Sequence, residues 1–78
     1  VWLQDGYEHI WLPYTQMQHG RIPHAVIGAE GSTLKLADGR TLIDGIASWW
    51  SMCHGYQYAP IVDAITQQAQ TLSHVMFA

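Results

Sequence analysis

Residues 44–56 read Asp-Gly-Ile-Ala-Ser-Trp-Trp-Ser-Met-Cys-His-Gly-Tyr, and the patterns on either side lead into and out of this stretch. A hairpin pattern precedes it and an amphipathic helical pattern follows it. It contains two adjacent tryptophans, Trp49 and Trp50. Adjacent indoles on extended backbone point in opposite directions. We therefore expect one of them to line a cavity or an interface, while the alternative that both are packed in a core stays open.

An antiparallel β-meander is predicted over residues 21–50. Residues 25–27 form a short apolar run, and two more strand-like runs, residues 34–37 and 40–43, flank Asp38-Gly39. This dipeptide favours a two-residue type I′ turn, in which both central residues take positive φ. The expected pairs on one face are Leu34 with Ile43 and Leu36 with Thr41, with Lys35 and Leu42 on the other face.

Residues 51–78 are expected to form a loop followed by an amphipathic helix. Pro60 suits the first helical turn, where Asp63 would complement the helix dipole. Apolar residues then recur at steps of three or four: Ile61, Ile65, Ala69, Leu72 and Met76. Such a stripe indicates a helix face that packs in a core more often than one that contacts a cofactor.

Residues 1–20 mix aromatic and polar side chains without a clear period, and a short helix or turn is compatible with residues 5–11. Pro13 interrupts this segment by constraining Leu12 to extended geometry. We expect an N-terminal aromatic arm that lies across another surface. Tyr14 offers an apolar ring and one hydroxyl, a combination suited to a polar organic substrate. The pattern alone still favours a tyrosine that is simply packed on a neighbouring surface.

Composition suggests a surface that something else covers. The 78 residues are 49% hydrophobic and only 12% charged, against about 25% charged in typical domains. A chain of this length makes one small domain or a piece of a larger one, and we expect a fragment. The single cysteine, Cys53, excludes an internal disulfide and fits a reducing compartment, so cytoplasmic localisation is expected.

Charge and spacing argue against several functions. The net charge is −3 with three strong cations, so the basic patch of a nucleic-acid-binding protein is absent. The apolar run at residues 46–53 is far shorter than the roughly 18 residues of a membrane span. His19 and His24 have a zinc-like spacing but no obvious partner pair, and Cys53 and His54 would point apart, so no metal site is expected. From pattern alone the chain is an aromatic-rich α+β fragment.

A resemblance takes the interpretation further. Residues 9–17, His-Ile-Trp-Leu-Pro-Tyr-Thr-Gln-Met, resemble the N-terminal signature of the adenosylmethionine-8-amino-7-oxononanoate aminotransferases, which belong to the class III pyridoxal-phosphate aminotransferases. Further blocks match the same family in the same order: residues 38–40, 42–45, 48–50, 54–56 and 73–77. The likeness covers residues 9–78 almost without gaps.

The resemblance implies the N-terminal part of a longer, homodimeric aminotransferase of fold type I. Such an enzyme would move the amino group of S-adenosylmethionine to 8-amino-7-oxononanoate in biotin synthesis. Tyr14 would touch the amino acceptor and help set stereospecificity, Trp49 would form a wall of the substrate slot, and Trp50 would support that wall. Pyridoxal 5′-phosphate would be bound by residues beyond position 78, and Lys35 is not expected to carry it.

Two other readings stay open. The chain could belong to another class III aminotransferase, of the ornithine or 4-aminobutyrate type. It could also be a non-enzymatic α+β interaction module, which would fold cooperatively by itself. No catalytic, cofactor-binding or metal-binding residue is expected within residues 1–78.

Overall fold

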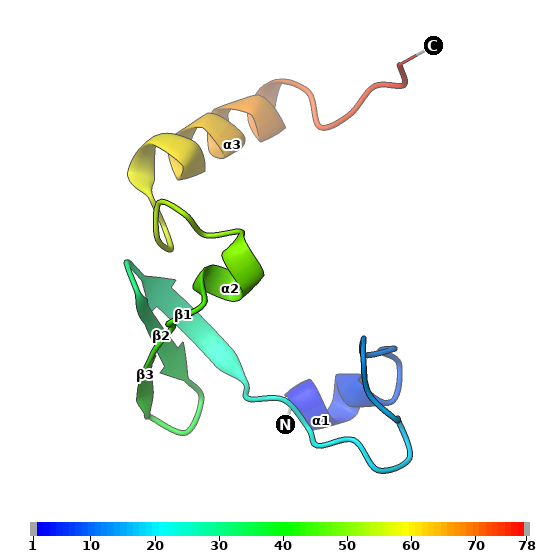
Figure 1. Ribbon diagram of the computed structural model, residues 1–78. Coiled ribbons are helices and arrows are strands. Elements are labelled where there is room, and N and C mark those ends of the chain that lie inside the picture. The colour runs from blue at the N-terminus through cyan, green and yellow to red at the C-terminus, as the bar shows by residue number, and fades with distance from the viewer. Residues whose placement is uncertain (1, 78) are drawn as a thin grey trace.

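Residues 2–77 are described by the computed structural model of the chain, and they form three helices and three strands. In chain order these are α1 (Trp2–Tyr7), β1 (Val26–Glu30), β2 (Thr33–Leu36), β3 (Thr41–Ile43), α2 (Ala47–Trp50) and α3 (Ala59–Thr71). In Figure 1 the sheet lies at the lower left, α1 at the lower right and α3 at the top, with α2 between the sheet and α3. The expected α+β architecture with a small antiparallel sheet is confirmed.

The three strands form a meander in the order β1-β2-β3, with antiparallel neighbours. Ala29 of β1 pairs with Leu34 of β2, and the β1 register shifts between Val26 and Gly28, which marks a bulge. Leu36 at the end of β2 is the one buried hydrophobic side chain among the described residues, with 3% of its surface exposed.

The predicted hairpin register is wrong by one residue. Leu34 pairs with Leu42, and Thr33 rather than Leu34 lies opposite Ile43. The cause is the turn. The Gly39 N–H donates to the Leu36 carbonyl at 3.1 Å, and Gly39 alone of the two turn residues has a positive φ, 90°. This is a three-residue connection with a left-handed glycine, not a type I′ turn. Because of this turn, Leu34 and Leu42 lie opposite each other on the same face of the sheet.

Asp38 stabilises this turn from the outside. Its two carboxylate oxygens accept hydrogen bonds from the backbone N–H of Arg40, at 3.0 Å, and from the Arg40 Nε, at 2.8 Å. The backbone bond is the larger cause that holds the pKa of Asp38 below its usual value, followed by the side-chain bond. Both side chains are exposed, so we assign this pair little stability.

The C-terminal helix is shorter than its apolar stripe. Pro60 lies in the first turn as expected, but Asp63 falls beyond that turn. Helix α3 ends at Thr71, and Leu72 is extended, with φ −162° and ψ 118°. Leu72 and Met76 therefore lie outside the helix, contrary to the periodic pattern. The side chain of Gln68 donates to the Leu72 carbonyl at 3.0 Å and satisfies one of the free acceptors at this helix end.

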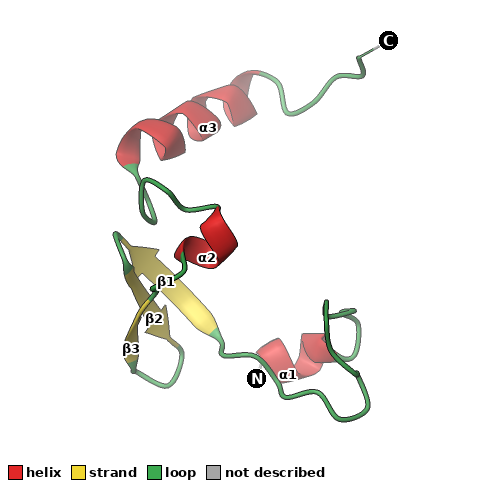
Figure 2. Ribbon diagram, in the orientation of Figure 1, coloured by secondary structure: helices red, strands yellow, loops and turns green. Residues whose placement is uncertain are grey.

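The short helix or turn expected near residues 5–11 is present in part. Helix α1 covers Trp2–Tyr7, and a turn follows it, in which the His9 N–H donates to the Gly6 carbonyl at 3.0 Å and the Ile10 N–H to the Tyr7 carbonyl at 3.2 Å. Residues 8–25 then run to β1 without a helix or strand, which Figure 2 shows as one long loop.

The described elements leave most of their apolar faces open. The accessible surface is 7161 Å², whereas a folded monomer of this size would expose about 4,800 Å². The radius of gyration is 15.9 Å, against about 11.5 Å for a compact domain of this length. The helices and strands described are thus extended in space and do not pack around one hydrophobic core.

Candidate substrate-binding site

Tyr14 of the N-terminal segment and Trp49 of α2 lie against each other, although they are far apart in the sequence. Their ring centroids are 5.5 Å apart and the ring planes make an angle of 62°, an edge-to-face contact. This is a favoured geometry for two aromatic rings. Tyr14 is nevertheless 91% exposed and Trp49 65% exposed. The pair forms an open aromatic surface, and the substrate-binding role of both residues stays a prediction.

The backbone under Trp49 is left-handed. Ala47, Ser48, Trp49 and Trp50 have φ of 49°, 47°, 56° and 75°. The expectation of an extended segment, with the two indoles on opposite faces, is therefore wrong. The Trp50 N–H donates to the Ile46 carbonyl at 3.0 Å, which closes one left-handed helical turn. An L-residue in this conformation costs roughly 1–2 kcal/mol, so the turn needs other contacts to hold it.

Trp50 lies on the same turn but is 85% exposed. Among residues 2–77 its ring is not in contact with another aromatic ring. The structure thus brings Tyr14 and Trp49 together, and it does not bring Trp50 into this pair. The supporting role expected for Trp50 stays a prediction.

The carboxylate of Asp44 holds the start of this turn. Its Oδ1 accepts the Ile46 backbone N–H at 3.0 Å, and its Oδ2 accepts the Ser48 backbone N–H at 2.8 Å. The Tyr56 hydroxyl donates to the same Oδ2. Because that hydroxyl has one proton, its hydrogen bond with Ser48 must be donated by the serine Oγ. Three groups thus donate to the Asp44 carboxylate, and the Ser48 hydroxyl donates to the tyrosine that is one of them.

These bonds fix the protonation states of the network. The Tyr56 hydroxyl is the largest cause that lowers the pKa of Asp44, followed by the backbone N–H groups of Ile46 and Ser48. The same bond raises the pKa of Tyr56. Asp44 is therefore ionised and Tyr56 neutral at neutral pH, which is the combination that the hydrogen bonds require.

Tyr56 is itself tied to the sheet. It forms two reciprocal backbone bonds with Gly31, at the turn between β1 and β2, with N···O distances of 2.8 and 3.1 Å. Gly55 beside it has φ of 82°, and a Cβ there would lie 3.1 Å from the Gly31 carbonyl oxygen. Asp44 is anchored to the same turn, since its N–H donates to the Ser32 carbonyl at 2.8 Å.

The sequence patterns assigned no role to Asp44 and did not identify this network. Strand β3 ends at Ile43, directly before Asp44. A usable signal was present for one of the bonds: an Asp side chain often accepts the backbone N–H of the residue two positions later, as Asp44 does from Ile46. The contribution of Tyr56 depends on the tertiary fold and has no such signal.

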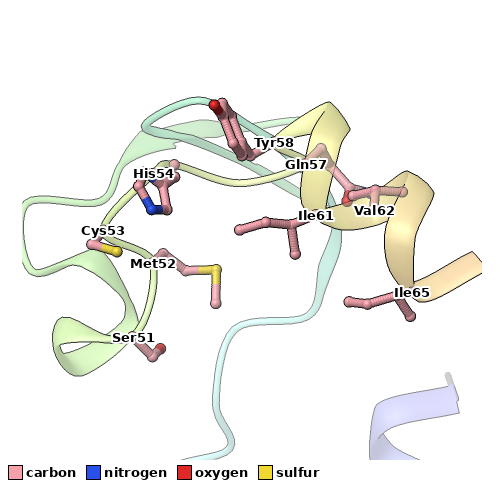
Figure 3. Close-up of a pocket in the computed structure, with 10 residues that line it drawn as sticks. Ser51, Met52, Cys53, His54, Gln57, Tyr58, Ile61, Val62 and Ile65 are labelled. Atoms are coloured by element: carbon pink, nitrogen blue, oxygen red, sulfur yellow. The ribbon is translucent and has the colours of Figure 1, made fainter. Parts of the chain in front are cut away.

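A separate apolar groove of about 300 Å³ lies between α3 and the loop before it. Figure 3 shows Ile61 and Ile65 of α3 across from Met52 and Cys53 of the loop. At its rim the rings of His54 and Tyr58 stack, with centroids 5.1 Å apart and an interplanar angle of 22°. The groove is not lined by Tyr14, Trp49 or Trp50.

Other candidate chemistry within residues 2–77 can be placed. No three His, Cys, Asp or Glu side chains in this part of the chain gather to hold a metal ion. Cys53 is a free, exposed thiol. Lys35 lies on β2 opposite Thr41 of β3. None of the helices described has both the length and the apolar character needed to cross a membrane.

The comparison with protein families decides the assignment. The family model described as "Aminotransferase class-III" matches residues 14–78. The chain belongs to the class III aminotransferase family. The match begins at Tyr14 and includes Trp49, so both members of the aromatic pair lie within the family region.

Individual relatives of this class III chain are named adenosylmethionine-8-amino-7-oxononanoate aminotransferase. The protein from Synechococcus elongatus is 49% identical over 73 residues, which cover 94% of the chain and 17% of that relative. The protein from Buchnera aphidicola subsp. Schizaphis graminum is 42% identical over 71 residues, covering 91% of the chain and 16% of the relative. The Saccharomyces cerevisiae protein is 34% identical over 73 residues, covering 88% and 15%.

The resemblance inferred from the sequence blocks is thus confirmed. The chain spans a small part, 15–17%, of each of these relatives.

Proposed function

We propose that this chain is the N-terminal part of a pyridoxal-phosphate-dependent aminotransferase that acts on S-adenosylmethionine and 8-amino-7-oxononanoate, the reaction of biotin biosynthesis. The observation that carries the proposal is the likeness, up to 49% identical over 94% of the chain, to relatives named for this pair of substrates. The edge-to-face pair of Tyr14 and Trp49 supports it from the geometry.

In this reaction the amino group leaves the donor, which becomes a 2-oxo acid. It replaces the oxygen on C7 of the acceptor, which gives 7,8-diaminononanoate. Family membership implies the use of pyridoxal phosphate, and the bound cofactor supplies the electron sink for the transfer. The contribution of the present chain to this reaction is contact with the substrates.

The aromatic pair suits both substrates of the proposed reaction. The acceptor carries a long aliphatic chain, and the donor carries a flat adenine ring. A flat indole wall offers contact area to each at low conformational cost, and the phenol hydroxyl of Tyr14 adds one directional hydrogen bond. We therefore assign Trp49 as a wall of the slot, Tyr14 as the contact to the acceptor and Trp50 as support for the wall.

The described residues do not fit a site for the cofactor itself. A pyridoxal phosphate enzyme uses a lysine to hold the cofactor. The only lysine here, Lys35, lies on the hairpin, with its side chain running over Gly28 of the neighbouring strand. We propose that the cofactor binds to other parts of the longer protein.

The open surface supports the remaining parts of the proposal. Trp11 and Tyr14 are each 91% exposed and Trp50 is 85% exposed, more large aromatic surface than a lone small domain usually leaves to water. We propose that the rest of a fold type I aminotransferase chain, and a second subunit in a homodimer, cover these faces. Cytoplasmic localisation belongs to the same proposal.

The test uses the full-length protein that contains this chain. Its denatured intact mass establishes first whether the protein is several times larger than residues 1–78. The purified protein is then incubated with pyridoxal phosphate, S-adenosylmethionine and 8-amino-7-oxononanoate, and 7,8-diaminononanoate is detected by mass spectrometry. We expect this product to form only when both substrates are present.

Matched reactions with ornithine or 4-aminobutyrate as the amino donor and a 2-oxo acid as the amino acceptor test the other class III aminotransferases. Amino transfer from either of these, without transfer from S-adenosylmethionine, would assign the chain to a different class III aminotransferase. An intact mass equal to that of residues 1–78 together with no transfer from any donor would favour the interaction module.

A further inference from the structure

We propose that Asp44 and Tyr56 are positioning residues for Trp49, and that together they hold the left-handed turn α2 in the conformation that sets the Trp49 indole against Tyr14. The inference rests on the proposed function, because it concerns the same substrate-binding surface. It assigns a role to a carboxylate and a phenol that neither the sequence blocks nor the aromatic contact explains.

The need for such a device follows from the backbone. Four consecutive L-residues, 47–50, have positive φ, a conformation that L-residues adopt singly and rarely in runs. A strained segment of this kind persists only where the surrounding contacts determine it. Burial does not supply those contacts, because Trp49 and Trp50 are both exposed and the turn contains no buried residue.

Hydrogen bonds to Asp44 supply them instead. The carboxylate binds the backbone N–H of Ile46 just before the turn and of Ser48 inside it, at 3.0 and 2.8 Å. The bond to Ser48 fixes the peptide group between Ala47 and Ser48, one residue before Trp49. The Ser51 hydroxyl, which donates to the Ser48 carbonyl at 2.8 Å, fixes the far side of the same residue.

Tyr56 connects this turn to the sheet. Its hydroxyl bridges the Asp44 carboxylate and the Ser48 hydroxyl, while its backbone pairs with Gly31 in the turn between β1 and β2. The path from the sheet to the indole is therefore continuous: Gly31, Tyr56, Asp44, Ser48 and Trp49. Side-chain position depends on such supporting bonds, and a displacement of about 1 Å at a binding site can cost on the order of a hundredfold in rate.

The chain provides a matched control. Asp38 also accepts the backbone N–H of the residue two positions later, Arg40, in an exposed turn. Asp38 lies in the turn that joins β2 to β3, whereas Asp44 follows the opposite end of β3. Asp38→Asn therefore makes the same chemical change as Asp44→Asn without touching the turn that carries Trp49.

The experiment labels the full-length protein with 5-fluorotryptophan and follows Trp49 by fluorine NMR, with its resonance assigned by its loss in Trp49→Phe. We expect Asp44→Asn to shift or broaden this resonance, because the new amide NH₂ or the lost charge breaks the bonds to Ser48 and Tyr56. Tyr56→Phe should move it in the same direction by less, and Asp38→Asn should leave it unchanged.

Kinetics provide the second readout. Asp44→Asn should lower kcat/KM for the amino acceptor on the order of tenfold to a hundredfold, and the double variant with Tyr56→Phe should lose less than the two single effects multiplied, because the residues act as one network. If Asp44→Asn does not fold, the Trp49 resonance and the kinetics of Tyr56→Phe test the positioning role, since this variant removes one hydroxyl and keeps the carboxylate.

The outcomes separate this inference from the proposed function. An unchanged Trp49 resonance in folded Asp44→Asn and Tyr56→Phe proteins would overturn the positioning role, even if the enzyme transfers the amino group as proposed. A wild-type protein that fails to convert the proposed substrates would overturn the function, while the Trp49 resonance would still test the positioning role.

Discussion

Trp49 is the single side chain whose removal best separates binding from folding. It is 65% exposed, and its aromatic contact in the described chain is the edge of Tyr14. Loss of one such contact costs about 1 kcal/mol of unfolding free energy. We expect Trp49→Ala in the full-length protein to lower kcat/KM by at least about tenfold while the unfolding free energy falls by no more than about 1 kcal/mol.

Denaturant unfolding and steady-state kinetics on the same preparation measure both quantities. Trp11→Ala is the matched control, because it makes the same substitution at a tryptophan that lies outside the aromatic pair. It should leave the kinetics with the acceptor unchanged. Losses of activity and stability of similar size in Trp49→Ala would assign Trp49 to packing.

A second prediction at the residue scale concerns the pH dependence of stability. The Tyr56 hydroxyl, followed by the N–H groups of Ile46 and Ser48, lowers the pKa of Asp44 in the folded protein. A lowered folded pKa stabilises the protein above the unfolded value, about 3.9, and the stabilisation is lost as the pH falls through the folded value. The melting temperatures of wild type and Asp44→Asn should therefore differ by a constant amount between about pH 5 and 7.

Below about pH 4 this difference should shrink, because the wild-type carboxyl becomes protonated as well. Tyr56→Phe removes the largest cause of the lowered pKa, so it should lose less stability than the wild type when the pH is lowered from neutral to acid values. Calorimetric melts over the pH range give the comparison. A difference that stays constant down to the lowest pH would show that the charge of Asp44 has no part in holding the turn.

At the scale of elements, the sequence predicted which segments form strands and helices better than it predicted their local geometry. Alternation and turn residues were sufficient for the meander. The register failed because Asp-Gly fits both a two-residue turn and a three-residue turn with a left-handed glycine, and only Gly39 takes positive φ here. Helical periodicity likewise continued through Leu72, where the backbone is already extended.

The site was predictable only in part, and for a different reason. Side-chain chemistry pointed to Tyr14 and strand alternation to the tryptophan pair, but only the family resemblance gave Tyr14 and Trp49 a shared role. No local pattern indicates that an arm residue and a turn residue meet. The left-handed turn was not predictable from propensity, since Ala, Ser and Trp all disfavour positive φ. It depends on Asp44 and on Tyr56, and the latter reaches the turn only through its pairing with Gly31.

That pairing carries a prediction of its own. Gly55 has φ of 82°, and a Cβ at this position would lie 3.1 Å from the Gly31 carbonyl oxygen. Gly55→Ala therefore introduces both backbone strain and a close contact with backbone. We expect it to lower the unfolding free energy by about 1–2 kcal/mol, measured by denaturant titration of the full-length protein.

Gly45→Ala is the matched control, because a Cβ at Gly45 meets nothing within 4 Å and its φ lies outside the left-handed range. It should change the unfolding free energy by no more than about 0.5 kcal/mol. Equal effects of the two substitutions would mean that the close approach of residues 55 and 31 does not constrain the fold.

For the whole molecule, the solvent-accessible surface area decides whether these residues can form a stable fold alone. Residues 2–77 have one buried hydrophobic side chain, and α3 contains none. The accessible surface of 7161 Å² exceeds that of a compact monomer of this size by roughly half. Hydrophobic burial is the main favourable term in folding, so these elements need a partner surface to reach the usual stability. This argues for the longer aminotransferase and against the free-standing interaction module.

The last prediction follows from that deficit. Residues 1–78 expressed alone should lack fixed tertiary packing: far-UV circular dichroism should show some secondary structure, while near-UV signals from the four tryptophans stay weak and heating produces no cooperative transition. The hydrophobic dye ANS should bind strongly to the exposed apolar faces of the isolated chain. Size-exclusion chromatography should show association, because the apolar faces of α3 and of the aromatic arm of different molecules pack together. The full-length protein is the comparison, and there the same faces should be covered, with little dye bound and a cooperative melt. A monomeric, cooperatively unfolding chain of 78 residues would reverse the argument, because it would show that these residues form a stable fold without a partner surface.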